Sequence, residues 1–418
     1  MHRFITVLSC HTGYAADDVL LSPSGVFTNL EESEIAAIGH NINDFILACT
    51  YAGVACDLEN DFETFYDSAF FKCFTFTGEQ VADDIEVGSG PRHGLSLILY
   101  LEAEVDGDPY NLDAFEYNIY SPVENGVGAR IEIHGKDEMP NPQAAGFDVM
   151  PGHSTSMKLT ATEIIKQPDP YSNCTSKKNL DQISGYSYSS ARCIDECAAE
   201  YVYAKCGCAP QLYTLTDAMT ADGALYCRFF DVDAGMRADE LLVNMDCETR
   251  YTQDFNADSQ HRHKCKCYES CDYIIYDETI SESRWPAPLY LRDMYQEYVL
   301  DHDDAESLTA YQQLSDIYHN ASRNTDFKEL VYNNFVRVNI YFRDVIIINI
   351  DEYPTYDAFT LLANIGGTIG LWAGLSMITL IDVGFLIGNL CILLGQKCMR
   401  RNEVTQIESR QSSQFKML

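Results

Sequence analysis

The stretch GGTIGLWAGLSMITLID, residues 366–382, is apolar along most of its length but contains a serine and an aspartate. It lies within the 39 residues between Asp357 and Lys397, where Asp382 is the only charged side chain. A helix needs about 20 apolar residues to cross the hydrocarbon core of a bilayer. We therefore expect one transmembrane helix over residues 358–395.

Ser376 and Asp382 need an explanation inside such a helix, because a carboxylate at membrane depth is costly unless it faces water or a partner. If copies of the chain surround an axis, each copy contributes one Ser376 and one Asp382 to a ring, as in cation pores. Two simpler explanations stay open. Asp382 could snorkel to the nearby interface, and Ser376 could bond to a carbonyl one turn earlier.

Three glycines, Gly366, Gly370 and Gly374, form a stripe along the same segment. Small residues at four-residue spacing let another helix approach the backbone closely. This pattern alone indicates packing only. It also supports a different class of protein, a single-pass, disulfide-rich receptor or adhesion protein that dimerises through the glycine stripe.

Charge sets the orientation and excludes one class of partner. The chain has 63 acidic and 28 basic side chains, a net charge of −35, and binding of nucleic acid requires the opposite sign. Residues 396–418 carry +3, so the residues before them carry −38. Basic segments stay in the cytoplasm. We expect a plasma-membrane protein with an extracellular domain over residues 1–357 and a cytoplasmic tail over residues 396–418.

Fourteen of the 16 cysteines precede the membrane segment, which indicates a disulfide framework in an oxidising compartment. Cys193 and Cys197 are about 6 Å apart on one face of a helix predicted to end near Lys205. Cys265 and Cys267 are about 6.6 Å apart if HKCKCYESC, residues 263–271, is a strand. The matching distances predict two adjacent bridges, with a zinc cluster as the alternative.

The remaining patterns predict a mixed α+β domain. We expect a first strand over residues 4–10, a helix followed by a strand over residues 40–76, and strands from Gly94 onward. Residues 287–334 are helix-like. The Val- and Ile-rich alternation of residues 335–353 predicts a strand that leads directly to the membrane segment.

In the order of these pieces the chain resembles the degenerin and epithelial sodium channel family, the amiloride-sensitive sodium channels, which includes acid-sensing and peptide-gated channels. The resemblance runs from about residue 40 to residue 395. The motifs that carry it are Cys73-Phe-Thr-Phe76, Gly94-Leu-Ser, His134 before Pro140, Pro151-Gly152, Pro170-Tyr171 before Cys174, the paired cysteines, Tyr276, Trp285-Pro286, Asn339-Ile-Tyr-Phe342 and the Gly-x-Ser tripeptide. It implies a β-rich palm and ball, helical finger, thumb and knuckle elements, and one C-terminal transmembrane helix.

The resemblance also implies a set of disulfides. These are Cys49–Cys56, Cys174–Cys271, Cys193–Cys267, Cys197–Cys265, Cys206–Cys247, Cys208–Cys227 and, across a short stretch, Cys10–Cys73. Two of them are the adjacent bridges predicted from spacing. Cys391 and Cys398 lie at the cytoplasmic end and are expected to be reduced.

In such channels the tripeptide Gly374-Leu375-Ser376 narrows the pore and breaks the helix, so that carbonyls and hydroxyls replace part of the hydration shell of sodium. Asp382 is then the acidic position below it. The resemblance places Ala363 and Asn364 at the outer pore, where many members carry an aspartate instead of Asn364. It places Tyr171 at the wrist that couples the outer domain to the pore.

The function implied is a subunit of a trimeric, sodium-permeable cation channel gated from outside by a ligand, protons or force. Its expected partners are sodium ions, other subunits, the lipid bilayer and a peptide or proton ligand. We expect no enzyme, cofactor or metal site, since HExxH, nucleophile-elbow and Walker motifs are absent from the sequence. Asn320 is a predicted glycosylation acceptor. Family members have a first membrane helix, which residues 1–30 do not contain; we expect a fragment of a channel or, as the alternative, a single-span subunit.

Overall fold

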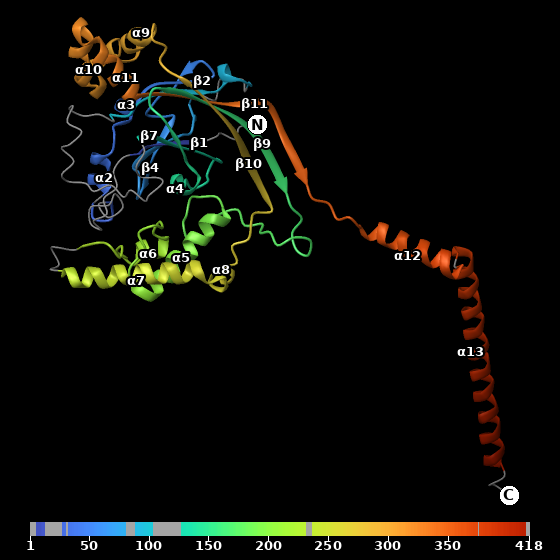
Figure 1. The fold of residues 1–418 in the computed structure, drawn as a ribbon. Coiled ribbons are helices and arrows are strands. Elements are labelled where there is room, and N and C mark those ends of the chain that lie inside the picture. The colour runs from blue at the N-terminus through green and yellow to red at the C-terminus, as the bar shows by residue number, and fades with distance from the viewer. Residues whose placement is uncertain are drawn as a thin grey trace. The chain divides into compact units, whose positions relative to one another are not determined.

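The computed structural model describes residues 6–12, 27–30, 32–80, 88–102, 127–230, 236–374 and 376–414. The chain divides into two compact units, Met1–Glu352 and Tyr353–Leu418. The first unit combines two β-sheets with separate groups of helices (Figure 1). The second contains α12 (Ala358–Ala373) and α13 (Met377–Gln414). This architecture confirms the predicted α+β class with a disulfide-rich domain before an apolar C-terminal segment.

The smaller sheet has five antiparallel strands in the order β4-β5-β1-β7-β8. Their bounds are β1 Thr6–Thr12, β4 Phe62–Asp67, β5 Phe71–Phe76, β7 Gly128–His134 and β8 Phe147–Val149. A strand at the start of the chain was predicted, and β1 confirms it. It lies between β5 and β7 in the centre of the sheet.

The larger sheet has six strands in the order β10-β9-β11-β6-β2-β3. Their bounds are β2 Ile46–Tyr51, β3 Val54–Ala55, β6 Leu95–Tyr100, β9 His153–Ile165, β10 Asp272–Arg284 and β11 Phe335–Asp351. β9 pairs in parallel with β11 and antiparallel with β10. The predicted strand over residues 335–353 is therefore confirmed as β11, the strand that ends the first unit.

The larger sheet is buried on both faces in its middle. Leu97 and Leu99 of β6 face the side chains of the smaller sheet, whereas Ile98 and Tyr100 pack against helices on the opposite face. Those helices are α9 Leu291–Tyr295, the π-helical turn Gln296–Leu300, α10 Thr309–His319 and α11 Asn324–Asn334, with short 3₁₀ turns at Ala305–Ser307 and Ala321–Arg323. A further 3₁₀ turn, Pro91–His93, precedes β6. This alternation fixes the strand register, because a shift of one residue would exchange the two faces.

A second helical group contains most of the disulfides. It comprises α5 Ser190–Cys206, α6 Asp217–Ala221, α7 Ala238–Ala257 and α8 Ser259–Cys265, which lie away from α9–α11 in Figure 1. The predicted end of α5 near Lys205 is confirmed. Gly207 follows with a φ of 73°, the left-handed conformation that commonly ends a helix.

The two adjacent bridges are present, but the predicted strand beneath them is wrong. Cys265 is the last residue of α8, and Lys266 follows in the left-handed region with a φ of 53°. This turn brings Cys267 back toward α5, so that the Cα atoms are 5.6 Å apart in Cys193–Cys267 and 5.9 Å apart in Cys197–Cys265. Since these four sulfurs are paired, they do not act as thiolate ligands, and the zinc alternative is wrong for them.

Six disulfides have both side chains in the described part of the structure, and these are six of the pairs implied by the resemblance. They are Cys49–Cys56, Cys174–Cys271, Cys193–Cys267, Cys197–Cys265, Cys206–Cys247 and Cys208–Cys227. The backbone register also places Cys10 of β1 opposite Cys73 of β5, and Cys73 is disulfide-bonded. The side chains of β1 lie outside the described part of the structure.

The predicted helix at the start of residues 40–76 is mostly wrong. After α2 (Glu32–Ile38), only the single turn α3 (Ile42–Phe45) is helical, and β2 follows without a break. Ala52 and Gly53 have φ values of 51° and 83°, so the chain reverses in two residues and β3 pairs with β2. Strand pairing and the Cys49–Cys56 bridge therefore outweigh the helical spacing of the apolar residues.

We expect Leu97→Ala to lower the free energy of unfolding by about 2–5 kcal/mol, because the side chain is fully buried between the sheets and its loss leaves a cavity. Thermal or denaturant unfolding of the purified chain in detergent, followed by near-UV circular dichroism, measures the change. Val54→Ala, on the exposed β3, is the matched control and should shift stability by less than about 0.5 kcal/mol. Equal shifts for both variants would contradict the assigned core.

Candidate functional site

The apolar C-terminal segment is interrupted in its middle. α12 ends at Ala373, Gly374 has a φ of 63°, and α13 begins at Met377. Leu375, between them, lies outside the described residues. The expected membrane helix over residues 358–395 therefore consists of two helices, and the break falls at the Gly374–Ser376 tripeptide. A residue with a Cβ is disfavoured at Gly374, because the left-handed region is costly for it.

Ser376 caps the second helix together with Thr379. The Ser376 Oγ accepts the Thr379 N–H at 3.3 Å, and the Ser376 N–H donates to the Thr379 Oγ1 at 2.6 Å. This reciprocal pair satisfies two backbone donors at the start of α13. Ser376 thus bonds to the turn that follows it rather than to the preceding one. Thr379 was not among the predicted site residues, although a serine three residues before a side chain that can accept a hydrogen bond has the spacing of a capping box.

α13 is long and apolar enough to cross a bilayer. Within Met377–Arg401 the most apolar 18 residues have a mean hydropathy of 2.2, whereas the apolar part of α12, Ala358–Trp372, is shorter than a full span. α13 also continues to Gln414, so part of the predicted tail over residues 396–418 is helical. Cys391 and Cys398, on this helix, are free and exposed.

Polar side chains form a line along α13. Thr379, Asp382, Asn389 and Gln396 follow one another at spacings of three and seven residues, which places them within about 100° of one face. Gly384, Gly388, Cys391 and Gly395 fall on the opposite face by the same geometry. One face therefore suits water and the other suits close helix packing. The spacing of these polar residues is visible in the sequence, but only Ser376 and Asp382 were predicted to line a pore.

The two residues predicted for the outer pore lie on α12. Ala363 falls on the same face as Gly366 and Gly370, so it extends the stripe of small residues by one turn. Asn364 lies one position around the helix, and its carbonyl accepts the Thr368 hydroxyl at 2.7 Å. Both residues are exposed in the isolated chain.

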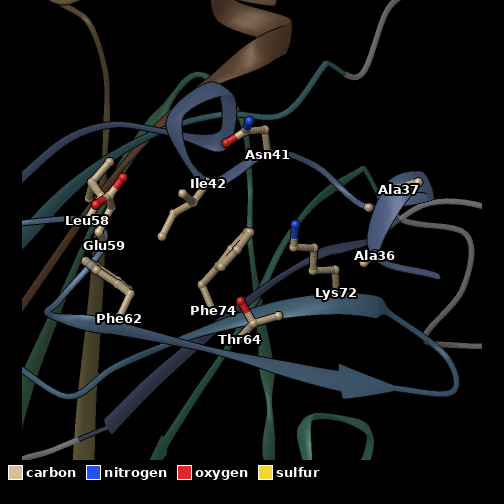
Figure 2. Close-up of a pocket in the computed structure, with 11 residues that line it drawn as sticks. Ala36, Ala37, Asn41, Ile42, Leu58, Glu59, Phe62, Thr64, Lys72 and Phe74 are labelled. Carbon is tan, nitrogen blue, oxygen red and sulfur yellow. The ribbon is translucent and has the colours of Figure 1, made fainter. Parts of the chain in front are cut away.

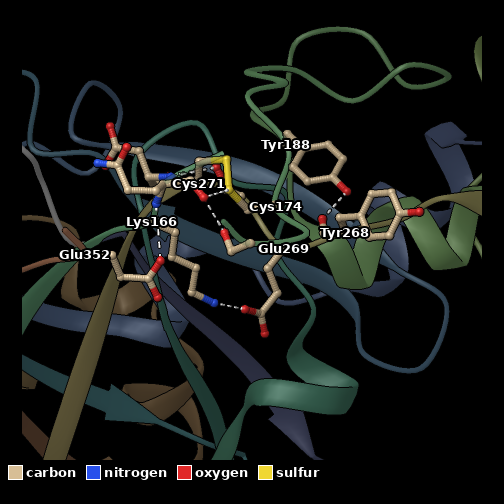
Figure 3. Close-up of polar contacts among 11 residues, drawn as sticks. Lys166, Cys174, Tyr188, Tyr268, Glu269, Cys271 and Glu352 are labelled. Carbon is tan, nitrogen blue, oxygen red and sulfur yellow. Dashed lines mark hydrogen bonds and ion pairs between the residues drawn. A yellow bond between two sulfur atoms is a disulfide. The ribbon is translucent and has the colours of Figure 1, made fainter. Parts of the chain in front are cut away.

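The segment that leads to Tyr171 is hydrogen-bonded to the last residue of the first unit, Glu352 (Figure 3). The Glu352 N–H donates to the Ile165 carbonyl at 2.9 Å, and the Glu352 carboxylate accepts the Gln167 N–H at 3.2 Å. Tyr171 itself is exposed, and its N–H donates to the Pro168 carbonyl at 3.1 Å. The end of β9 and the end of β11 are therefore held together where the chain leaves the sheet.

The same loop is also tied to the start of β10. The Cys174–Cys271 disulfide and the ion pair between the Lys166 ammonium and the Glu269 carboxylate join the two segments. The Lys166 N–H donates to the Cys271 carbonyl at 2.7 Å. Three strands that are distant in sequence thus meet in one cross-linked junction, with Tyr171 on its exposed side.

A buried group of titratable side chains lies where α5 meets the smaller sheet. The Glu132 carboxylate accepts the Asn141 N–H at 2.7 Å, and the Arg192 guanidinium donates to the Pro140 carbonyl. The His134 Nδ1 donates to the Gly135 carbonyl at 3.0 Å, and its Nε2 has no hydrogen-bond partner in the described structure.

Burial dominates the titration of this group. It raises the pKa of Glu132 to about 7, against the lowering effects of the Asn141 N–H and the Arg192 charge. It lowers the pKa of His134 to about 4, and the Arg192 charge acts in the same direction. Burial also raises the pKa of Asp67, whose carboxylate accepts the Ala69 N–H at 2.8 Å. The folded domain therefore favours neutral Glu132 and neutral His134.

The amiloride-sensitive sodium channel family matches residues 22–386, and the chain belongs to that family. It is 26% identical over 410 residues to the FMRFamide-activated amiloride-sensitive sodium channel of Cornu aspersum, covering 88% of this chain and 64% of that protein. It is 26% identical over 383 residues to the epithelial sodium channel subunit gamma-2 of Xenopus laevis, covering 90% and 50%.

A third relative is the degenerin del-1 of Caenorhabditis elegans, 25% identical over 377 residues, which cover 90% of this chain and 48% of that protein. The chain therefore spans about half to two thirds of the length of these relatives. The family membership confirms the resemblance seen in the sequence, and this family is one of sodium channels.

We expect Ser376→Ala to loosen the first turn of α13, because the Thr379 N–H loses its acceptor. A lost cap costs about 1 kcal/mol, which corresponds to about fivefold faster amide hydrogen exchange over residues 377–380. Hydrogen exchange with mass spectrometry in detergent measures this change, with residues 386–390 as the internal control. Unchanged exchange in the first turn would mean that the cap does not form.

Glu132 and His134 should give opposite pH dependences of stability. The pKa of Glu132 rises from 4.5 to about 7 on folding. Its contribution to the free energy of unfolding is therefore present below pH 4.5 and is lost as the pH rises to 7. The pKa of His134 falls from 6.5 to about 4, so its contribution is present above pH 6.5 and is lost as the pH falls to 4.

Relative to the unsubstituted chain, Glu132→Gln should therefore gain about 3 kcal/mol of unfolding free energy between pH 4.5 and 7. His134→Asn should gain a similar amount between pH 6.5 and 4. Denaturant unfolding at a series of pH values measures the difference in unfolding free energy between each variant and the unsubstituted chain. Plotted against pH, these differences give one curve for each variant. Parallel curves, or gains in the reverse directions, would contradict the burial of these groups.

Proposed function

We propose that this chain is a subunit of a trimeric, sodium-permeable cation channel of the plasma membrane, gated through its acidic extracellular domain. Membership of the amiloride-sensitive sodium channel family supports the channel activity. The names of the relatives support sodium as the ion and a peptide as one class of stimulus. The basic C-terminal end, inside by the positive-inside rule, leaves the acidic domain and the glycosylation acceptor Asn320 outside.

The observation that carries the proposal is the interrupted membrane helix with a polar face. A break at Gly374 exposes backbone groups, which lipid cannot satisfy but a water-filled pore can. The line from Thr379 through Asp382 to Asn389 continues from this break along α13. In a symmetric assembly these side chains face the axis, and the opposite, glycine-rich face packs against other helices.

Ion selection follows from the groups at the break. The residues proposed to line the narrowest point are Gly374, Leu375 and Ser376, whose carbonyl and hydroxyl oxygens replace part of the water around sodium. Asp382, one to two turns below, attracts cations electrostatically. Asn364 at the outer mouth is neutral, so the inner carboxylate is the main attractive charge along the path. Ala363 lines the same mouth with a small side chain.

An exposed apolar strip supports the assembly of several copies. Ile346, Ile348 and Ile350 alternate along one face of β11 and are about half exposed or more in the isolated chain. Patches of this kind usually mark contacts with a partner. Because β11 leads directly to the membrane segment, neighbouring copies around a common axis would cover the strip.

The route for gating is the three-strand junction around Tyr171. β11 pairs with β9 as far as Asp351 and Ile165, and Tyr353 starts the second unit directly afterwards. The Cys174–Cys271 bridge and the Glu352 contacts make the end of β11 move with the extracellular domain. Tyr171, exposed at this junction, is the proposed contact that passes the movement to the pore.

The direct test is sodium current. The chain is expressed in oocytes alone, fused behind the first membrane helix of a relative, and together with a full-length relative. Ser376→Phe should abolish or strongly reduce the current, because the bulky ring fills the narrowest point. Asp382→Asn should lower the conductance for cations by removing the attractive charge.

Leu380→Phe is the control for added bulk off the polar line, since Leu380 lies about 160° around α13 from Asp382. It should leave both the current and its selectivity unchanged. Surface labelling confirms that each variant reaches the membrane. Equal currents in the Ser376→Phe and Leu380→Phe variants would exclude the pore assignment and favour the single-pass receptor that dimerises through its glycines.

A further inference from the structure

Four short polar contacts join Ser376 to Thr379 at the break between α12 and α13. The Ser376 N–H donates to the Thr379 Oγ1 at 2.6 Å, and the Thr379 N–H donates to the Ser376 Oγ at 3.3 Å. The two hydroxyl oxygens are 3.0 Å apart, and the Thr379 Oγ1 lies 2.9 Å from the Ser376 carbonyl oxygen. A helix cap needs only the first two of these contacts. The other two fix the Ser376 hydroxyl itself.

The number of hydrogens sets the direction of these bonds. A hydroxyl has one hydrogen to donate and two lone pairs that accept. If Thr379 donates its hydrogen to the Ser376 carbonyl, its oxygen accepts both the N–H and the O–H of Ser376, and all four contacts are hydrogen bonds. If Thr379 donates to the Ser376 Oγ instead, the Ser376 hydroxyl hydrogen has no acceptor among the described residues. The first arrangement satisfies more polar groups and is therefore favoured.

This arrangement decides which oxygen of Ser376 is available to an ion. The Ser376 carbonyl accepts the Leu380 N–H at 3.1 Å as well as the Thr379 hydroxyl, so both of its lone pairs are used. The Ser376 Oγ donates to Thr379 and accepts the Thr379 N–H, which leaves it one lone pair. A hydroxyl that presents a lone pair attracts a cation, whereas a hydroxyl that presents its hydrogen repels one.

We propose that Thr379 is a positioning residue for ion selection. Its hydroxyl holds the hydrogen of the Ser376 Oγ away from the ion path, so that each copy of the chain offers sodium a lone pair at the narrowest point. The Thr379 hydroxyl does not bind the ion itself, because Ser376 already uses its hydrogen and both of its lone pairs. The inference rests on the proposed channel function and adds the residue that orients the Ser376 hydroxyl.

The test removes the Thr379 hydroxyl without changing the outline of the side chain. Thr379→Val keeps the branched shape but can neither donate nor accept. In oocytes that express the chain fused behind the first membrane helix of a relative, reversal potentials in sodium and potassium solutions measure the permeability ratio. We expect Thr379→Val to lower the sodium-to-potassium ratio about fivefold, the effect of one lost hydrogen bond. Thr379→Ser keeps a hydroxyl and should keep the ratio.

A double variant separates positioning from direct contact with the ion. Ser376→Ala removes the hydroxyl that Thr379 is proposed to orient, and alanine is smaller than serine, so the path stays open. In this background Thr379→Val should change the permeability ratio no further. A further fall in the double variant would mean that Thr379 contacts the ion itself, and it would overturn the proposal.

Two other threonines allow the same substitution as controls. The Thr368 hydroxyl donates to the Asn364 carbonyl within α12 at 2.7 Å. Thr64 belongs to the first unit, where it lines a pocket of about 460 Å³ between α3 and β5 (Figure 2). Thr368→Val and Thr64→Val should leave the permeability ratio unchanged. A fall as large as in Thr379→Val would show that the effect is not specific to the Ser376 hydroxyl, and it would overturn the proposal.

A second measurement does not depend on current. Hydrogen exchange of the full chain in detergent, resolved to single amides, should be about fivefold faster at Ser376 in Thr379→Val, because this N–H loses its acceptor. Thr379→Ser and Thr368→Val should exchange at Ser376 as the unsubstituted chain does. Unchanged exchange at Ser376 in Thr379→Val would show that the hydrogen bonds to Thr379 do not form, and the proposal would fail.

Failure of the channel and failure of this role give different results. Absence of sodium current from the unsubstituted chain, when expressed alone, as the fusion and with a full-length relative, would reject the channel and this role of Thr379 with it. Sodium current with the same permeability ratio in Thr379→Val as in the unsubstituted chain would reject the role of Thr379 alone. An equal fall in Thr379→Ser and Thr379→Val would reject it too, because serine retains the hydroxyl.

Discussion

Backbone groups at the depth of a bilayer need hydrogen-bond partners, and this requirement governs the C-terminal unit. A helix end leaves its last four carbonyls and its first four N–H groups without partners inside the helix. The chain ends one helix at Ala373 and starts another at Met377. Ser376 and Thr379 satisfy donors at the start of α13, and the carbonyls at the end of α12 need water, ions or protein. Such a break is stable in a membrane only where it lines a cavity.

The first unit, which we propose to be extracellular, holds the strand that leads to the apolar segment in a fixed register. The larger sheet is buried on both faces where β6 lies, so the strands cannot shift in register without exchanging core and surface. Its strands β9, β10 and β11 then extend beyond the core to the junction at Glu352. There the Cys174–Cys271 disulfide and the Lys166–Glu269 ion pair hold the three strands together. A rigid sheet that ends in a cross-linked junction transmits displacement better than a set of loops.

Electrostatics acts on two scales in this chain. The charge of −38 on the residues before the C-terminal tail attracts cations from solution, which suits the proposed cation pore. Inside the domain, burial favours the neutral forms of Glu132 and His134. It raises the pKa of the Glu132 carboxyl above its usual value and lowers the pKa of the His134 imidazole below its usual value. This group joins α5 to the smaller sheet, where Arg192 holds the Pro140 carbonyl.

The sequence by itself determined what depends on local pattern and composition: the apolar segment, the polar Ser376 and Asp382 within it, β11, α5 with its end at Gly207, and the disulfide framework. It did not determine how Cys265 and Cys267 reach α5, because the left-handed Lys266 replaces a strand by a helix and a turn. It also suggested a helix where β2 and β3 lie. Only the tertiary structure decided these points, and the pocket between α3 and β5, because each depends on contacts between residues far apart in the chain that no local spacing encodes.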